Sequence, residues 1–228
     1  MASAISPLIW RDLWLNALPM PGRRDGSLVS RPAAELLLEA FLVSFGAVAI
    51  AEIGDKTQLL ALILAVRFRA PLAVIAGIFV ATVANHALAA FAGTLIASWL
   101  TPGILAWVLA VSFILMGLWA LIPDDAPSED EAQSVNRFGP FIATTVAFFL
   151  VEMGDKTQLA TVALGARYDA LVMVALGTTL GMMAANVPVV LFGGALAGRI
   201  PAKVMRFAAA LIFIALGLIG MATALAMT

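Results

Sequence analysis

A short polar motif occurs twice in this 228-residue chain, and its residue types could bind a cation. The copies are EIGDKTQL at residues 52–59 and EMGDKTQL at residues 152–159, so seven of eight positions are identical at an offset of 100. Both copies lie inside long apolar runs. Because a charged side chain is costly in a bilayer, such residues indicate a functional site by default.

The acidic and amide side chains of each copy would share one face of a continuous helix, because residues three apart are neighbours there. The predicted metal ligands are Glu52, Asp55, Gln58, Glu152, Asp155 and Gln158. Their oxygens suit a hard divalent cation such as Ca²⁺, Mn²⁺ or Mg²⁺. Four acids and two lysines sum to a charge of −2, which one such cation neutralises. Protons compete for the same oxygens, which predicts an antiporter.

Six further motif residues are predicted to support or gate this site. They are Lys56, Thr57, Lys156, Thr157, Gly54 and Gly154. Each lysine could pair with a carboxylate or a helix-end carbonyl, or it could snorkel or gate. Each threonine could bond to a carbonyl one turn back or offer its oxygen to the site. The glycines allow another helix to approach closely, or allow the helix to unwind and expose carbonyl ligands. The sequence leaves these alternatives open.

Three polar residues outside the motif are predicted to line the transport pathway. Asn85 and Asn186 occupy corresponding mid-span positions, where they could also be polar contacts between helices. His86 has no counterpart and could be a hydrogen-bonded core histidine or a proton relay. The plain alternative for the whole motif is a buried ion-pair network that only joins two helices, although small residues can do that more simply.

The composition indicates an all-α integral membrane protein. Hydrophobic residues make up 63% of the chain, charged residues only 12%, and the mean hydropathy is +1.04, far from the roughly 25% charged residues of a soluble domain. Six apolar segments could each span a bilayer: about 36–65, 72–96, 104–122, 141–164, 170–197 and 202–226. The absence of cysteines excludes disulfides and thiolate metal sites, and there is no basic footprint for nucleic acid.

The six spans form an internal repeat. Residues 1–34 are a mobile or interfacial tail, residues 35–122 the first repeat, residues 123–138 an acidic connector and residues 139–228 the second repeat. Three spans are an odd number, so the second repeat would enter the membrane from the opposite side. We therefore predict two inverted-topology three-helix repeats with a site near the midplane, as in many secondary transporters.

Loop charges suggest an orientation. The connectors after the first, third and fifth predicted spans, together with the first turn of the sixth, hold six basic residues: Arg67, Arg69, Arg137, Arg199, Lys203 and Arg206. The other face holds only Arg167, although the four arginines of the tail make the difference six against five. The positive-inside rule then places the acidic connector in the cytoplasm. We expect the membrane to be a bacterial plasma membrane.

The doubled E-x-G-D-K-[ST] signature, in six spans with a polar connector, resembles the GDT-one family (uncharacterised protein family sixteen) of cation/proton antiporters. The resemblance covers about residues 36–226 and leaves the tail unexplained. It implies that Glu52, Asp55, Glu152 and Asp155 serve exchange of Mn²⁺ or Ca²⁺ for protons, with manganese export in bacterial members. The metal would then be the transported substrate, with no resident cofactor and no enzyme activity.

Two other classes of protein remain as alternatives. An intramembrane aspartyl hydrolase would use Asp55 and Asp155 as a dyad sharing one proton. Against this, Glu52 stands where such a signature would have glycine. The other alternative is a passive cation channel or an exporter of organic cations. Neither the choice between Mn²⁺ and Ca²⁺ nor the oligomeric state follows from the sequence.

Overall fold

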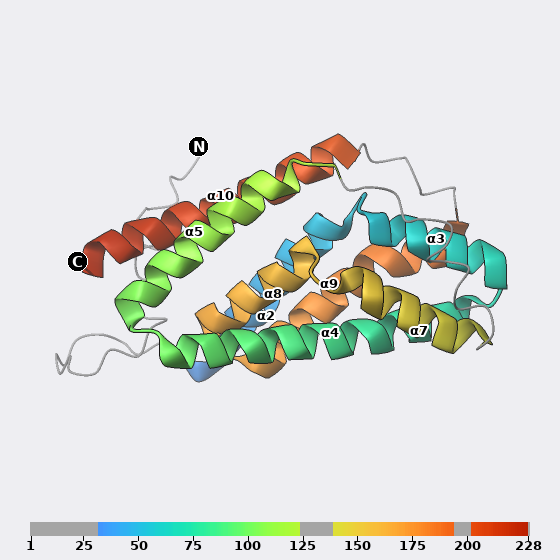
Figure 1. The fold of residues 1–228 in the computed structure, drawn as a ribbon, viewed down its shortest axis with the longest axis horizontal. Coiled ribbons are helices and arrows are strands. Elements are labelled where there is room, and N and C mark those ends of the chain that lie inside the picture. The colour runs from blue at the N-terminus through green and yellow to red at the C-terminus, as the bar shows by residue number, and fades with distance from the viewer. Residues whose placement is uncertain (1–31, 124–138, 194–201, 228) are drawn as a thin grey trace.

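The computed structural model describes residues 32–123, 139–193 and 202–227, and these residues form eight helices with no strands (Figure 1). The helices are α2 (Ala33–Glu52), α3 (Lys56–Phe68), α4 (Pro71–Trp99), α5 (Pro102–Ala120), α7 (Gly139–Glu152), α8 (Lys156–Tyr168), α9 (Leu171–Phe192) and α10 (Ala202–Met227). Five of them, α2, α4, α5, α9 and α10, are long and apolar enough to cross a membrane. The predicted tail, up to residue 31, and the acidic connector, from residue 124, lie outside the described residues.

Helix ends follow from local sequence and recur in both halves. Pro71 and Pro102 begin α4 and α5, where a missing N–H costs nothing. Arg69 and Asp169 cap α3 and α8 in the left-handed conformation, with φ of 51° and 46°. Each cap donates its N–H to a carbonyl four residues back. The two halves therefore turn in the same way between their first and second apolar segments.

Both motifs interrupt a helix, so of the two alternatives that the sequence left open, a continuous helix and an unwound one, the unwound one applies. α2 ends at Glu52 and α3 begins at Lys56, while α7 ends at Glu152 and α8 begins at Lys156. Gly54 and Gly154 lie between them with φ of 85° and 80°, a conformation that glycine adopts without steric cost. We call residues 53–55 and 153–155 the first and second breaks. Irregular backbone at membrane depth is tolerated where protein buries it or where it lines a cavity, which suits a binding site.

Each broken helix packs against a long helix of the other half. α9 lies against α2, and α4 lies against α7 and α8. A Cβ at Gly77 of α4 would lie 2.8 Å from the Phe141 carbonyl oxygen, and one at Gly177 of α9 would lie 2.5 Å from the Phe41 carbonyl oxygen. Only glycine permits backbones to approach this closely. The two contacts are equivalent at the offset of 100, so the halves interlock reciprocally.

The third long helices, α5 and α10, pack side by side (Figure 1). Gly117 lies against Ile214, and Gly217 lies against Ile114, so the two contacts exchange partners at the same offset. Between them the Phe113 and Phe213 rings stack with centroids 6.4 Å apart. This pair is apolar and contributes no charged side chain to the described site.

Candidate metal centre

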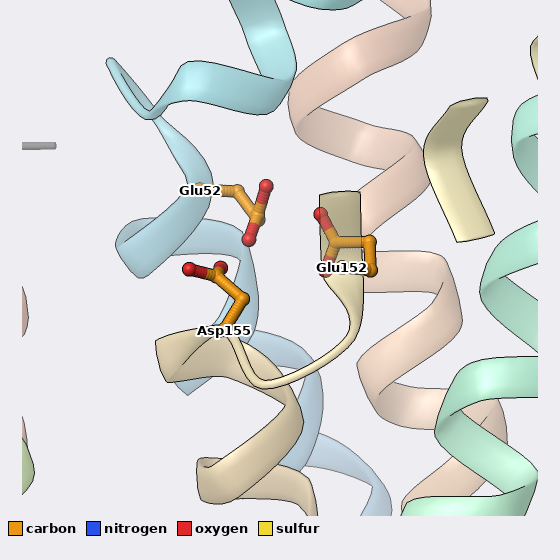
Figure 2. A group of neighbouring side chains, drawn as sticks. All are labelled: Glu52, Glu152 and Asp155. Atoms are coloured by element: carbon orange, nitrogen blue, oxygen red, sulfur yellow. The ribbon is translucent and has the colours of Figure 1, made fainter. Parts of the chain in front are cut away.

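Three carboxylates from the two halves converge at the breaks (Figure 2). Glu52 is the last residue of α2, Glu152 is the last residue of α7, and Asp155 immediately precedes α8. Each offers an oxygen within 4.8 Å of the other two. The exposed fractions of Glu52, Glu152 and Asp155 are 0%, 0% and 3%, so water does not solvate these charges in this state.

Each glutamate has one oxygen held by a threonine and one that is free. Thr57 Oγ1 donates to Glu52 Oε2 at 2.6 Å, and Thr157 Oγ1 donates to Glu152 Oε2 at 3.1 Å. Oε1 of both glutamates is buried and has no hydrogen-bond partner among the described residues. A buried carboxylate oxygen without a partner is costly, so a cation or a proton at this point would be stabilising.

Lys56 connects the first break to the second. Its Nζ lies 3.2 Å from Asp155 Oδ1, so a lysine of one half forms an ion pair with an acid of the other. Lys156 Nζ donates to the Ile122 carbonyl at 3.0 Å and lies 5.7 Å from the centroid of the Trp119 ring. The sequence gave no signal for Trp119 or Ile122, since neither belongs to the repeat motif.

The remaining motif residues lie around the breaks. Asp55 is 8% exposed and is not among the three convergent carboxylates. Gln58 Oε1 accepts a hydrogen bond from the Gly54 N–H at 2.9 Å, and Gln158 Oε1 accepts one from the Gly154 N–H at 2.7 Å. The amide oxygens thus stabilise the breaks, and a role for Asp55 or the glutamines as metal ligands stays a prediction.

The predicted pathway residues are all buried. Asn85 Nδ2 donates to the Phe149 carbonyl at 3.0 Å, whereas Asn186 Nδ2 donates to the Met182 carbonyl of its own helix at 3.1 Å. Neither ring nitrogen of His86 has a hydrogen-bond partner among the described residues. The structure therefore places Asn85 beside the second break and leaves the predicted pathway role of all three residues as a prediction.

A second charged cluster lies outside the repeated motif and was not predicted from the sequence. Glu39 on α2 accepts a hydrogen bond from the Tyr168 hydroxyl at 3.3 Å, and Arg167 Nη2 lies 4.0 Å from the same carboxylate. Arg167 is 5% exposed and stacks over the Tyr168 ring at 4.8 Å. The signal in the sequence is a charged residue beside an apolar run. The position equivalent to Glu39 in the second half is Gly139, so comparison of the two halves does not single out Glu39.

Comparison with known proteins assigns the family. A family model described as divalent cation/proton antiporter GDT1 matches residues 40–128 and 140–228. The chain belongs to this family. The two matched segments carry one motif each, so each half of this GDT1-family protein contributes one break to the acidic site. The family consists of transporters, so the protein is not an enzyme and the aspartyl hydrolase alternative falls away.

The relatives of this GDT1-family chain include bacterial and plant proteins. A Vibrio cholerae protein named "Putative manganese exporter" is 50% identical over 194 residues, which cover 85% of this chain and 96% of that protein. "GDT1-like protein 5" of Arabidopsis thaliana is 28% identical over 80% of this chain and 95% of its own length, and the rice protein of the same name is 27% identical over 81% and 95%. No solved structure matches the chain significantly.

Proposed function

We propose that the protein exchanges Mn²⁺, with Ca²⁺ as a second substrate, for protons across a bacterial plasma membrane and exports the metal. The observation that carries this proposal is the convergence of Glu52, Glu152 and Asp155 within 4.8 Å, where two glutamate oxygens have no hydrogen-bond partner in the described part of the chain. These are hard oxygen donors, the class that Mn²⁺ and Ca²⁺ prefer. The name of the Vibrio cholerae relative supports manganese as the exported ion.

Charge explains why metal and protons are coupled. The four motif acids and two motif lysines sum to −2. A site with that charge, enclosed by apolar helices, is costly to carry through the low-dielectric interior when it is empty. One divalent cation or two protons neutralise it. The protein can therefore change its facing state readily only when one of these occupants is bound, and this condition produces exchange.

The proposed architecture has six spans in two inverted repeats. α7 followed by α8 supplies the sixth span, although α7 alone is only 14 residues long. The reciprocal contacts at an offset of 100, in α5 with α10 and in α4 and α9 with the broken helices, support a two-fold relation between the halves. In such an arrangement both breaks lie near the midplane, where transporters of this plan bind their substrates.

The test is metal flux in proteoliposomes that contain the full chain. We expect Mn²⁺ to move against its gradient when a proton gradient is imposed, and the lumenal pH to change in step. Ca²⁺ should move more slowly and Mg²⁺ least. Apparent Mn²⁺ affinity should fall as pH is lowered from 8 to 6 on the loading side, because protons occupy the same oxygens (about two protons per metal).

Two results would overturn the proposal. Flux that follows the metal gradient and ignores an imposed proton gradient would indicate a channel. Proton-coupled flux of an organic cation without Mn²⁺ flux would indicate the organic-cation exporter. Empty liposomes and liposomes with a proton ionophore are the controls, because the ionophore must abolish uphill transport while leaving downhill exchange intact.

A further inference from the structure

Each break is joined to a long helix of the other half through its glutamine. Gln158 accepts the Gly154 N–H and donates from Nε2 to Asn85 Oδ1 on α4 at 3.4 Å. Gln58 accepts the Gly54 N–H and donates from Nε2 to the Ala185 carbonyl on α9 at 2.8 Å. The glutamines therefore transmit the position of α4 and α9 to the backbone between the acidic residues.

Asn85 on α4 forms hydrogen bonds with the helices on both sides of the second break. α7 ends at Glu152, so the carbonyls of its last turn lose the N–H groups that a continuing helix would supply. Asn85 Nδ2 provides a donor to one of them, the Phe149 carbonyl, at 3.0 Å. Asn85 thus accepts a hydrogen bond from α8 and donates one to α7, and it holds the two segments on either side of the break.

At the first break, Asn186 of α9 makes no corresponding connection to the described residues of α2 or α3. Asn186 is the counterpart of Asn85 with a shift of one residue, but its Nδ2 donates to Met182 on its own helix. Its Oδ1 is buried without a hydrogen-bond partner among the described residues. Gln58 Nε2, the donor that would match it, bonds to the carbonyl of the preceding residue, Ala185. Pro188 removes a helical hydrogen bond from α9 nearby, which gives this helix a local freedom that α4 lacks.

We propose that Asn85 and Asn186 are positioning residues that hold the two breaks in alternation during transport, an inference that rests on the proposed exchange. In the present structure, Gln158 bonds to Asn85, and Asn186 Oδ1 accepts no hydrogen bond from any described residue. In the opposite-facing state Gln58 bonds to Asn186 and Asn85 is released. One hydrogen bond forms as its equivalent breaks, so the two states stay close in free energy, as a transporter that must visit both requires.

The absence of native cysteines allows a direct test by alkylation of single reporters. Ser44 on α2 and Thr144 on α7 are equivalent at the offset of 100 and are both 0% exposed. Ser44 packs against Gly177 on α9, and Thr144 packs against Gly77 on α4. Ser44→Cys therefore reports opening between α2 and α9, and Thr144→Cys reports opening between α7 and α4. Both reporter proteins are first required to transport Mn²⁺ at wild-type rates.

Alternation predicts opposite effects of the two asparagine variants. Asn85→Leu should raise the alkylation rate of Thr144→Cys and lower that of Ser44→Cys, each by at least about three- to tenfold, the population change expected from one lost hydrogen bond, since Asn85 makes two. Asn186→Leu should do the reverse. Thr94→Ala is the matched control, because the Thr94 hydroxyl on α4 bonds, within the described part of the chain, only to the Phe91 carbonyl of the same helix and its loss should change neither rate. Equal shifts of both reporters in one direction, or no shift, would overturn the proposal.

Two measurements separate this proposal from its alternatives. If Asn85→Leu does not yield monodisperse protein, Asn85→Ala is used, since it also removes the acceptor for Gln158 and the donor to the Phe149 carbonyl and should move both reporters in the same directions as the leucine variant. Mn²⁺ binding to the purified full chain is measured by calorimetry beside the metal-free alkylation. Absence of Mn²⁺ binding in the wild type would refute the proposed function, whereas reciprocal alkylation without metal tests the alternation alone.

Discussion

The two halves of this protein meet in two places that differ in symmetry: at the helix pair α5 and α10, and at the two breaks. In α5 and α10, the glycine contacts mirror each other: Gly117 lies against Ile214 as Gly217 lies against Ile114. At the breaks, corresponding residues have contacts that differ. Asn85 Nδ2 donates to the Phe149 carbonyl of the other half at 3.0 Å, whereas Asn186 Nδ2 donates to the Met182 carbonyl of its own helix at 3.1 Å. Repetition thus gives a symmetric apolar pair and an asymmetric polar site.

The difference follows from the kind of interaction. Glycine and isoleucine contacts depend on shape, and two copies of one shape fit each other in one best way. Hydrogen bonds and ion pairs at the breaks offer several partners of similar energy, so a small movement can exchange them. We infer that α5 and α10 support the structure while the breaks change during transport, and the following substitutions test that division from the largest expected effect to the smallest.

Glu52→Gln and Glu152→Gln should each abolish proton-coupled Mn²⁺ transport. Loss of a charged ligand should reduce flux more than the roughly 10- to 100-fold typical of residues that only support metal ligands. Flux in proteoliposomes is the measurement, with melting in detergent to confirm folding. Glu35→Gln, an exposed acid in the first turn of the same helix as Glu52, is the control and should transport normally. Normal flux in either site variant would show that the acids are not the transport site.

Gly117→Ala and Gly217→Ala should lower stability by similar amounts. A Cβ at either position would lie 2.6 Å or 2.5 Å from the Cγ1 of the facing isoleucine, an overpacking that costs about 1–3 kcal/mol. Melting in detergent measures the loss. Gly103→Ala, on α5 with open space around it, should be neutral. Mn²⁺ affinity should be unchanged, and a selective loss of affinity would contradict a supporting role for this pair.

Gly154→Ala should destabilise the second break although there is room for the methyl group. No atom lies within 4 Å of the added Cβ, so the cost, about 1–2 kcal/mol, comes only from φ of +80°. Gly46→Ala in α2 has equal space and helical backbone, and should instead gain about 0.5–1 kcal/mol. Thermal melts compare the two. Similar melting temperatures would mean that the break is not held in this conformation.

Thr57→Val should weaken Mn²⁺ binding modestly, by about 3- to 10-fold, because Glu52 Oε2 loses the hydroxyl at 2.6 Å that orients it. Thr57→Ser keeps the hydroxyl and should bind like the wild type. Calorimetric titration at one pH distinguishes them. Thr223→Val is the control in the supporting pair, because it removes a hydroxyl that bonds to the Ile219 carbonyl of its own helix, α10. A serine variant as weak as the valine variant would indicate a packing effect.

The long helices could be predicted from hydropathy, but the breaks could not. α4 at 71–99 lies within three residues of the predicted 72–96, since a proline begins it and apolar residues fill it. At Gly54 the neighbouring Lys56 and Gln58 are good helix formers, so local sequence favours continuity. The break depends on partners far along the chain, such as Asn85, which bonds to the Phe149 carbonyl.

For the site, the repeated motif predicted which acidic residues come together, whereas the spacing of residues along a helix did not predict where the glutamine side chains point. The doubled motif predicted that Glu52 and Glu152 belong to one metal site, and the structure brings an oxygen of each within 4.8 Å of Asp155. The continuous-helix geometry directed Gln58 at the metal, whereas its amide oxygen accepts the Gly54 N–H at 2.9 Å. Side-chain direction at a helix break depends on backbone torsions that residue spacing does not determine.

The exchange of partners between Gly117, Ile214, Gly217 and Ile114 has a consequence for chain connectivity. A surface that fits its own duplicate does not require both duplicates on one polypeptide. Two separate half-length chains, inserted in opposite directions, could present the same seam to each other. The covalent link would then serve mainly to guarantee one partner of each direction, and severed halves produced together should still find each other in the bilayer.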